Sequence, residues 1–153
     1  MSDAGIAAPR RWPARTFRPA PGRPAVQGGR AVVVTDSHED CRALYALVLR
    51  HAGFEVLEAE TGEEAIRLAF AHRPVAVVMA AVMRGVNGFR ALEVLRNHAA
   101  THSIPVLVVS SLCEHVHEQR AREAGCSAYL LKPCSPQCLL NEVRRCAVAP
   151  HPG

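Results

Sequence analysis

Short apolar runs alternate with longer amphipathic segments from Arg30 onward, and this alternation constrains the fold more than any other feature of the chain. Three of the runs are almost entirely apolar, which is typical of strands that are covered on both faces. Five strand–helix units joined by short connections predict a parallel sheet with helices packed on both sides. The strand-like runs are 31–35, 54–59, 75–79, 105–109 and 128–131.

The distribution of charge and proline divides the chain into parts. Residues 1–29 contain five Arg, one Asp and five Pro, and therefore carry the whole formal net charge of +4. The remaining residues contain 13 basic and 13 acidic side chains, so their formal charge is zero. We therefore expect a disordered Arg/Pro-rich tail at 1–29, a folded domain at 30–148 and a short tail at 149–153.

Apolar runs in the chain are short. None approaches the roughly 20 residues that a membrane-spanning helix requires. The pair Arg10-Arg11 resembles the start of an export signal, but no apolar core region follows it. We expect a cytoplasmic protein without a membrane segment.

The segment after the first strand predicts a helix that ends at Gly53. Ser37 is a residue type that caps helices, so we expect its hydroxyl to begin this one. Residues at helical spacing form one side of the segment, and we expect that side to face the core. Its members are Cys41, Leu44, Leu47, Val48 and His51.

Candidate functional residues lie where the strands end, because parallel α/β sheets bind ligands in the crevice at the carboxyl ends of their strands. The segment 75–92 covers one such end, yet it contains no Asp, Glu, Ser, Thr, His, Cys or Lys. This strand end lies where a reactive group is expected, but it carries no side chain that can react. The residues at the strand ends are Asp36, Ser37, Ala80, Ser110, Ser111, Lys132 and Pro133.

Segments in order and at matching spacing resemble the motifs of the response-regulator receiver domain of two-component signalling. The resemblance covers Arg30 to about Val148. VVVTDSHEDCR resembles the first strand and its acidic turn, and PVAVVMAAVMRGVNGF resembles the segment around the phosphoacceptor. IPVLVVSS resembles the segment of the switch hydroxyl, and AGCSAYLLKPCSP resembles that of the switch aromatic and a Lys-Pro pair. The resemblance implies a flavodoxin-like fold, a doubly wound five-stranded parallel sheet in the order 2-1-3-4-5 with helices on both faces.

The resemblance also implies a role for each candidate residue. In the family, the carboxylate that ends the third strand becomes an acyl phosphate, and it holds Mg²⁺ together with two paired acids. Ala80 stands at this acceptor position, and its methyl group can neither attack phosphorus nor bind a metal. Ser37 replaces one paired acid, so Asp36 is the one carboxylate that remains. The other matched positions are Ser110 for the switch hydroxyl, Tyr129 for the switch aromatic, Lys132 for the phosphate contact and Pro133 after it.

The loss of two acids changes what the site is expected to do. One carboxylate without a bound phosphate is a poor Mg²⁺ site, so we expect Mg²⁺ binding to be weak or absent. We expect no catalytic residue and no enzyme activity. Lys132 is the single lysine among 18 basic residues, and we expect it to form a direct ion pair with Asp36.

These features favour a pseudo-receiver of phosphorelay signalling that acts through protein–protein contacts. The resemblance places the contact surface at about 114–147, and the partners it implies are a histidine kinase or another regulator. The sequence leaves open whether the chain forms a homodimer.

Two alternatives from other functional classes remain open. The first is a thiol or metal sensor on the same fold, which would use Cys113, His115 and His117 with Cys134 or Cys138. The second is a nucleic-acid-associated adaptor acting through the basic tail at 1–29. The second is the weaker, because only Trp12 and Phe17 in that tail could stack on bases.

Overall fold

The described part of the chain forms a five-stranded, entirely parallel sheet with the order β3-β2-β4-β5-β6. The structure is a computed structural model and describes residues 30–83, 85–112 and 114–148; the predicted tails at 1–29 and 149–153 lie outside these ranges. Counted along the chain, the strand order is 2-1-3-4-5, which confirms the predicted doubly wound sheet. The strands are β2 (Ala31–Thr35), β3 (Glu55–Ala59), β4 (Ala76–Ala80), β5 (Val106–Ser110) and β6 (Ala128–Leu131).

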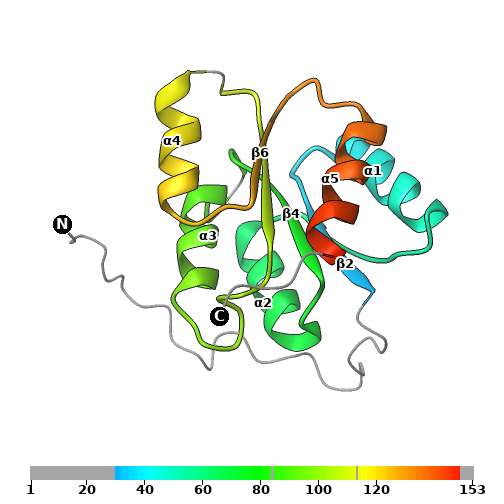
Figure 1. Cartoon of the computed structure of the whole chain (residues 1–153), viewed down its shortest axis with the longest axis horizontal. Coiled ribbons are helices and arrows are strands. Elements are labelled where there is room, and N and C mark those ends of the chain that lie inside the picture. The colour runs from blue at the N-terminus through cyan, green and yellow to red at the C-terminus, as the bar shows by residue number, and fades with distance from the viewer. Residues whose placement is uncertain (1–29, 84, 113, 149–153) are drawn as a thin grey trace.

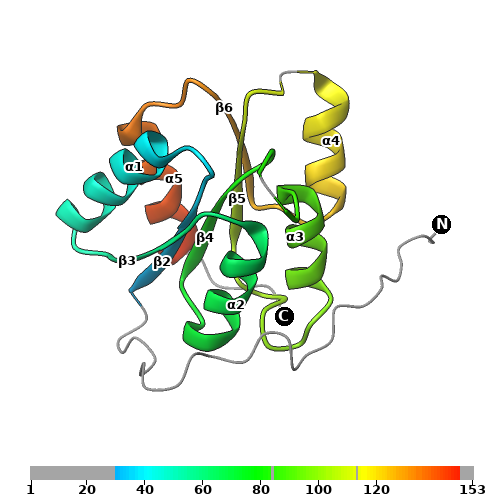
Figure 2. The ribbon, with the colours of Figure 1, turned by 180° about the vertical axis from the view of Figure 1, so that it is seen from behind.

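Helices cover both faces of the sheet (Figures 1 and 2). One layer contains two helices and the other contains three, as the two sets of buried contacts show. In the first layer α1 (Glu39–His51) and α5 (Pro136–Val148) pack against the sheet face of Val32 and Val34. The second layer, on the face of Val33, consists of α2 (Gly62–His72), α3 (Gly88–Arg96) and α4 (His115–Glu123).

The three inner strands are those with the most continuous apolar runs. Every residue of β2, β4 and β5 is buried, because successive side chains point to opposite faces and helices cover both. The edge strands β3 and β6 are only partly buried, although only β3 has a mixed polar and apolar sequence. The apolar runs of the inner strands therefore place the carboxyl ends of β2, β4 and β5 next to one another.

The first helix buries a different side from the one predicted. Its buried residues are Arg42, Tyr45, Ala46 and Leu49, whereas Leu44 and Leu47 are 47% and 64% exposed. The prediction was wrong because helical spacing alone does not specify which side of the helix meets the sheet. The Arg42 side chain lies on the buried side and reaches the end of the sheet.

Ser37 does not cap the first helix, which is a second correction. The N-cap residue is His38, and its side chain forms no capping hydrogen bond. The hydroxyl of Ser37 donates to Glu60 O at 3.1 Å, across the gap between two loops. The cap prediction failed because the backbone oxygen of Glu60, directly after β3, accepts the hydrogen bond of the Ser37 hydroxyl instead.

None of the helices found in the described ranges has both the length and the hydropathy needed to cross a bilayer.

Candidate functional site

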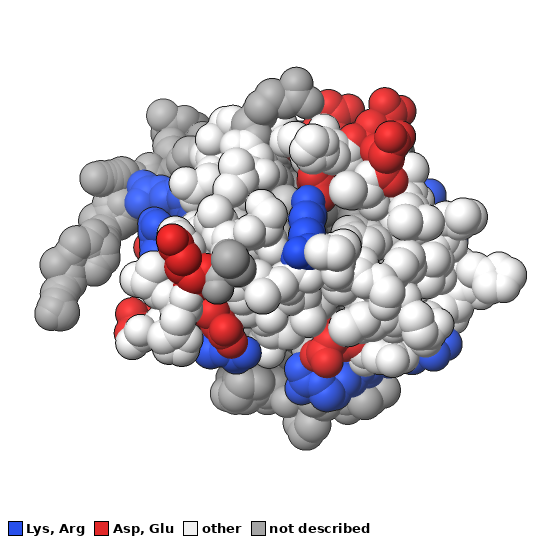
Figure 3. Space-filling view, turned by 90° about the horizontal axis from the view of Figure 1, so that it is seen from above, with Lys and Arg blue, Asp and Glu red and all other residues white. Residues whose placement is uncertain are grey.

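The loops that follow β2, β4 and β6 lie together at the upper edge of the molecule in Figure 1. Figure 3 views this upper face directly and shows basic and acidic side chains meeting near its middle. Asp36, Ser37, Ala80, Ser110, Lys132 and Pro133 lie at the carboxyl ends of strands of the sheet or directly after them. The sheet topology therefore gathers them at one edge, as expected for a doubly wound fold.

An ion pair between Asp36 and Lys132 lies at this edge. Lys132 Nζ donates to Asp36 Oδ2 at 3.0 Å, which confirms the predicted pair. The Asp36 side chain is 4% exposed and that of Lys132 is 24% exposed. The second carboxylate oxygen, Oδ1, accepts the backbone N–H of His38 at 2.9 Å. Both oxygens of the single remaining carboxylate are therefore engaged by the protein itself.

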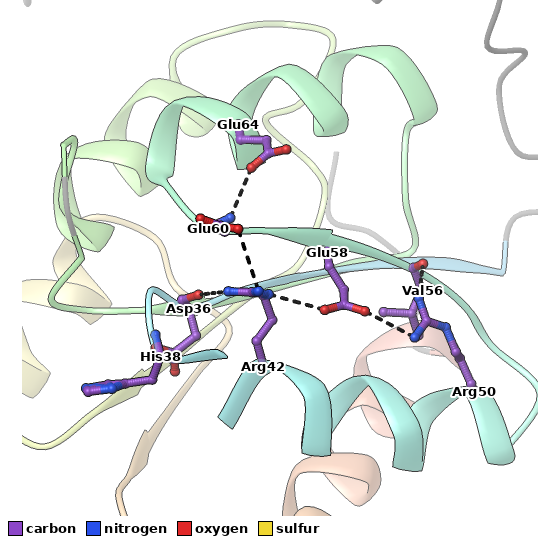
Figure 4. A network of polar contacts seen from close by, with 8 residues as sticks. All are labelled: Asp36, His38, Arg42, Arg50, Val56, Glu58, Glu60 and Glu64. Carbon is purple, nitrogen blue, oxygen red and sulfur yellow. Dashed lines mark hydrogen bonds and ion pairs between the residues drawn. The ribbon is translucent and has the colours of Figure 1, made fainter. Parts of the chain in front are cut away.

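Arg42 fixes the backbone beneath that carboxylate (Figure 4). Its Nη1 donates to Asp36 O at 2.9 Å, and its Nε donates to Glu58 Oε1 at 3.2 Å. The guanidinium thus joins the first helix to the ends of two strands. Sequence reasoning missed this residue, although one signal was available. An arginine lies one helical turn into α1, and acidic residues lie at 58 in β3 and at 60 just after it.

The end of β4 carries the buried methyl group of Ala80, which is 3% exposed. The loop after it turns back and packs directly on the strand end, where Gly88 N donates to Ala81 O at 2.9 Å. A Cβ atom on Gly88 would overlap Ala80 O and lie 2.8 Å from Ala81 Cα. This close approach requires a glycine, so the loop keeps its shape for reasons of packing even though the strand end has no reactive side chain.

The donor set does not fit a magnesium ion. Ala80 supplies no oxygen, Ser37 directs its hydroxyl to Glu60 O, and both oxygens of Asp36 are already hydrogen-bonded. Mg²⁺ prefers an octahedron of oxygen ligands that includes carboxylates. Among the residues that the structure describes, no group of three or more His, Cys, Asp or Glu side chains is arranged to hold a metal ion.

The two switch positions contact the same residue of the loop after β5. The Ser110 side chain accepts the backbone N–H of Leu112 at 2.8 Å through Oγ. The hydroxyl of Tyr129 donates to Leu112 O at 2.7 Å, and its ring packs against the buried cluster beneath α3 and α4. The structure therefore brings the side chains of Ser110 and Tyr129 together through Leu112, a link that the sequence did not reveal.

Lys132 is positioned by the backbone of the neighbouring strand. Its N–H donates to Ser110 O at 2.8 Å, which extends the pairing of β5 with β6 by one residue. The peptide bond between Lys132 and Pro133 is cis. The lysine of the ion pair and the switch hydroxyl thus share one ladder of backbone hydrogen bonds.

The described cysteine and histidine residues of the alternative metal site are divided between α4 and the region where α5 begins. His115 and His117 lie in α4, and His117 Nε2 is 3.0 Å from Glu114 Oε1. Cys138 lies in the first turn of α5, Cys134 lies two residues before that helix, and Cys113 lies outside the described residues. The described members of this set are therefore not gathered at a metal centre.

Comparison with known proteins gives consistent matches. A family model described as the response regulator receiver domain matches residues 32–144. The chain is 34% identical over 114 residues to the protein PilH of Pseudomonas aeruginosa. The match covers 74% of this chain and 93% of PilH. It is 29% identical over 106 residues to the polar-differentiation response regulator DivK of Brucella anthropi. That match covers 69% of this chain and 86% of DivK.

Solved structures match over the same region. A putative response regulator from Chloroflexus aurantiacus is 28% identical, with a TM-score of 0.75, and the match covers 80% of this chain and 100% of that one. The receiver domain of the sensor histidine kinase PA1611 from Pseudomonas aeruginosa shares the fold, with 20% identity and a TM-score of 0.73. The match covers 80% of this chain and 100% of that domain. That structure holds a magnesium ion in its active site cleft.

Proposed function

Because the chain belongs to the response regulator receiver domain family of two-component signalling, we propose that it acts as a pseudo-receiver. In this role it takes part in cytoplasmic phosphorelay signal transduction through protein–protein contacts. It is not phosphorylated at the end of β4, needs no cofactor and has no enzyme activity.

A single observation carries the proposal: the position of the phosphoacceptor is occupied by the methyl group of Ala80. An acyl phosphate requires a carboxylate oxygen that attacks phosphorus, and its transition state requires cations placed around the phosphoryl oxygens. Ala80 offers no attacking oxygen. The ammonium of Lys132 is paired with Asp36 at 3.0 Å. The positive charge that would contact a phosphoryl oxygen is therefore balanced by the carboxylate of Asp36.

The contact surface of this proposal is the face formed by α4, β6 and α5, at about 114–147. Two large apolar side chains on these elements are exposed, Val116 at 62% and Leu131 at 47%. Exposed apolar groups on a charged helix and a strand end are suited to burial against a partner protein. We propose a histidine kinase or another response regulator as the partner, with a second copy of the chain as a further candidate.

The hydrogen bonds to Leu112 support a role for the loop after β5 in such contacts. Ser110 and Tyr129 hold one residue of that loop from two strands, and the loop leads directly into α4. A partner that binds α4 would therefore act on the same hydrogen bonds. In this proposal the trigger is a bound protein rather than an acyl phosphate.

Incubation of the full-length protein with acetyl phosphate and Mg²⁺, followed by intact-mass measurement, tests the proposal. We expect no gain of phosphate, whereas a receiver with aspartate at the acceptor position, treated in parallel, should gain one. A hydroxylamine-labile phosphate on this chain would show that another carboxylate has replaced the acceptor, and the proposal would be wrong.

A further inference from the structure

The outer side of α1 carries a stripe of exposed side chains with an acid at one end, two leucines in the middle and a histidine at the other end. Its members are Asp40, Leu44, Leu47 and His51. They follow one another at spacings of four, three and four positions, so they lie on one side of the helix. Leu44 is 47% exposed and Leu47 is 64% exposed. The helix lies at the outside of the molecule beside α5 (Figures 1 and 2).

A groove of about 490 Å³ lies beside this stripe, between α1 and α5. Its lining includes Leu47, Val48 and His51 of α1 with Gln137, Leu140 and Arg144 of α5. The groove therefore combines apolar side chains with two basic residues, one from each helix. Apolar surface of this kind gains stability when another apolar surface covers it.

Charged residues at the stripe and the groove have no partner of opposite charge within the described ranges. No described side chain forms an ion pair with Asp40, His51 or Arg144. By contrast Arg145, the next residue after Arg144, is paired with Glu142. One end of the stripe therefore offers a free carboxylate, and the other end lies beside a free guanidinium.

The stripe is complementary to itself when its direction is reversed. Asp40 lies four positions before Leu44, and His51 lies four positions after Leu47. A two-fold axis between the two leucines therefore places an identical helix antiparallel to α1. Each leucine then meets the other leucine of the second copy, and each Asp40 meets the His51 and Arg144 of the second copy. A two-fold interface requires this self-complementarity, whereas contact with an unrelated protein does not.

We propose that the chain forms a homodimer in which α1 of one copy packs antiparallel against α1 of the other, along the groove between α1 and α5. Burial of Leu44 and Leu47 drives the association, because it removes apolar surface from water. The pairing of Asp40 with Arg144 and His51 selects the antiparallel direction, because a parallel arrangement would place like charges together.

This inference goes beyond the proposed function and does not depend on it. The contact surface at 114–147 rests on the exposed side chains of Val116 and Leu131, which take no part in the dimer. None of the contacts of the dimer involves Ala80. A receiver with or without a phosphoacceptor is therefore able to form it.

Sedimentation equilibrium of the full-length protein over a wide range of concentration tests the dimer. We expect an average mass that rises with concentration toward twice that of one chain. Leu47→Asp should raise the dissociation constant about 100-fold or more, because each dimer buries the introduced carboxylate twice. Val82→Asp is the matched control, since Val82 is 65% exposed in the loop after β4, and its dissociation constant should equal that of the wild type. Thermal melting establishes that each variant is folded.

An exchange of charges tests the direction of the helices. Asp40→Arg should weaken the dimer about tenfold, because it brings basic side chains together at both ends of the interface. Adding Arg144→Asp to this variant restores opposite charges and should recover most of the loss. A double variant that associates no better than Asp40→Arg would overturn the antiparallel pairing.

Two further results would overturn the proposal. One is a wild-type mass that stays at the value of a single chain at every concentration, and the other is an equal dissociation constant for the wild type and Leu47→Asp. A dimer that is kept in Leu47→Asp and lost in Val116→Asp would place the second copy on the surface at 114–147 instead. That result would refute this inference and leave the pseudo-receiver role intact.

Discussion

Lys132 Nζ lies 3.0 Å from Asp36 Oδ2, although the two residues are 96 positions apart in the chain. Their strands are not neighbours, because β4 and β5 lie between β2 and β6 in the sheet. The lysine therefore reaches over the ends of two strands to meet the carboxylate. The ion pair of Lys132 and Asp36 therefore occupies the centre of the site.

Replacement of Lys132 by Met should destabilise the fold. The substitution leaves the Asp36 carboxylate, 4% exposed, without its cation, and we expect a loss of about 1–3 kcal/mol in the free energy of unfolding. Chemical denaturation measures this loss. Adding Asp36→Asn to the variant should restore part of the stability, because the unpaired charge is then removed.

Arg122→Met is the matched control for this substitution. Its pair with Glu118 joins side chains that are 54% and 38% exposed, so its removal should change the free energy of unfolding by less than about 1 kcal/mol. An unchanged melting temperature of Lys132→Met would contradict the importance of the buried pair.

Restoring the acids should restore the magnesium response. In the double variant Ala80→Asp, Ser37→Asp, three carboxylates crowd one lysine, so we expect lower stability than that of the wild type without metal. Mg²⁺ at about ten times its dissociation constant should then stabilise the variant by about 1.4 kcal/mol. Melting temperatures with and without Mg²⁺ measure the effect. An equal response of the wild type would show that the native donor set binds the ion.

Arg42 should contribute more to stability than Arg50, although both contact Glu58. Arg42 is buried and its removal leaves Asp36 O and one oxygen of Glu58 without their donor, so Arg42→Met should cost about 2–4 kcal/mol. The Arg50 side chain is 50% exposed, and Arg50→Met should cost about 1 kcal/mol or less. Urea denaturation of the two variants provides the comparison, and equal losses would refute the ranking.

The shared contact with Leu112 predicts that Ser110 and Tyr129 are energetically coupled. Ser110→Ala and Tyr129→Phe each remove one hydrogen bond to this residue, at an expected cost of about 0.5–1.5 kcal/mol. The double variant should lose less than the sum of the two, because the first loss already frees the loop. A double-mutant cycle measures this coupling. Strict additivity would mean that the two bonds act independently.

Tyr45 should make stability fall at alkaline pH. Burial, with help from nearby Cys134, Cys41 and Asp36, raises its pKa from 10.0 to about 12. Between these values the folded state binds the proton that the unfolded state has lost, so the stabilisation present below pH 10 is lost as the pH rises through 12. Tyr45→Phe should show a smaller decrease over this range. Parallel stability curves for the two proteins would contradict the assignment.

The alternation of apolar and amphipathic segments was sufficient to predict the sheet, its inner strands and the positions of the candidate residues. These features depend on local periodicity and on a topology rule, and both can be read along the chain. The ion pair of Asp36 and Lys132 could also be predicted, because the loss of neighbouring acids left each charge with few partners.

Other features required the folded chain. Arg42 faces inward because one acceptor of its guanidinium lies directly after β2 and another lies in β3. Ser37 turns to Glu60 O, and Ser110 and Tyr129 meet at Leu112, for the same kind of reason. The spacing of apolar residues along the chain indicates which segments form buried strands and where those strands end. The choice of partner for a polar side chain depends on distances between segments that are remote in sequence, and only packing sets those distances.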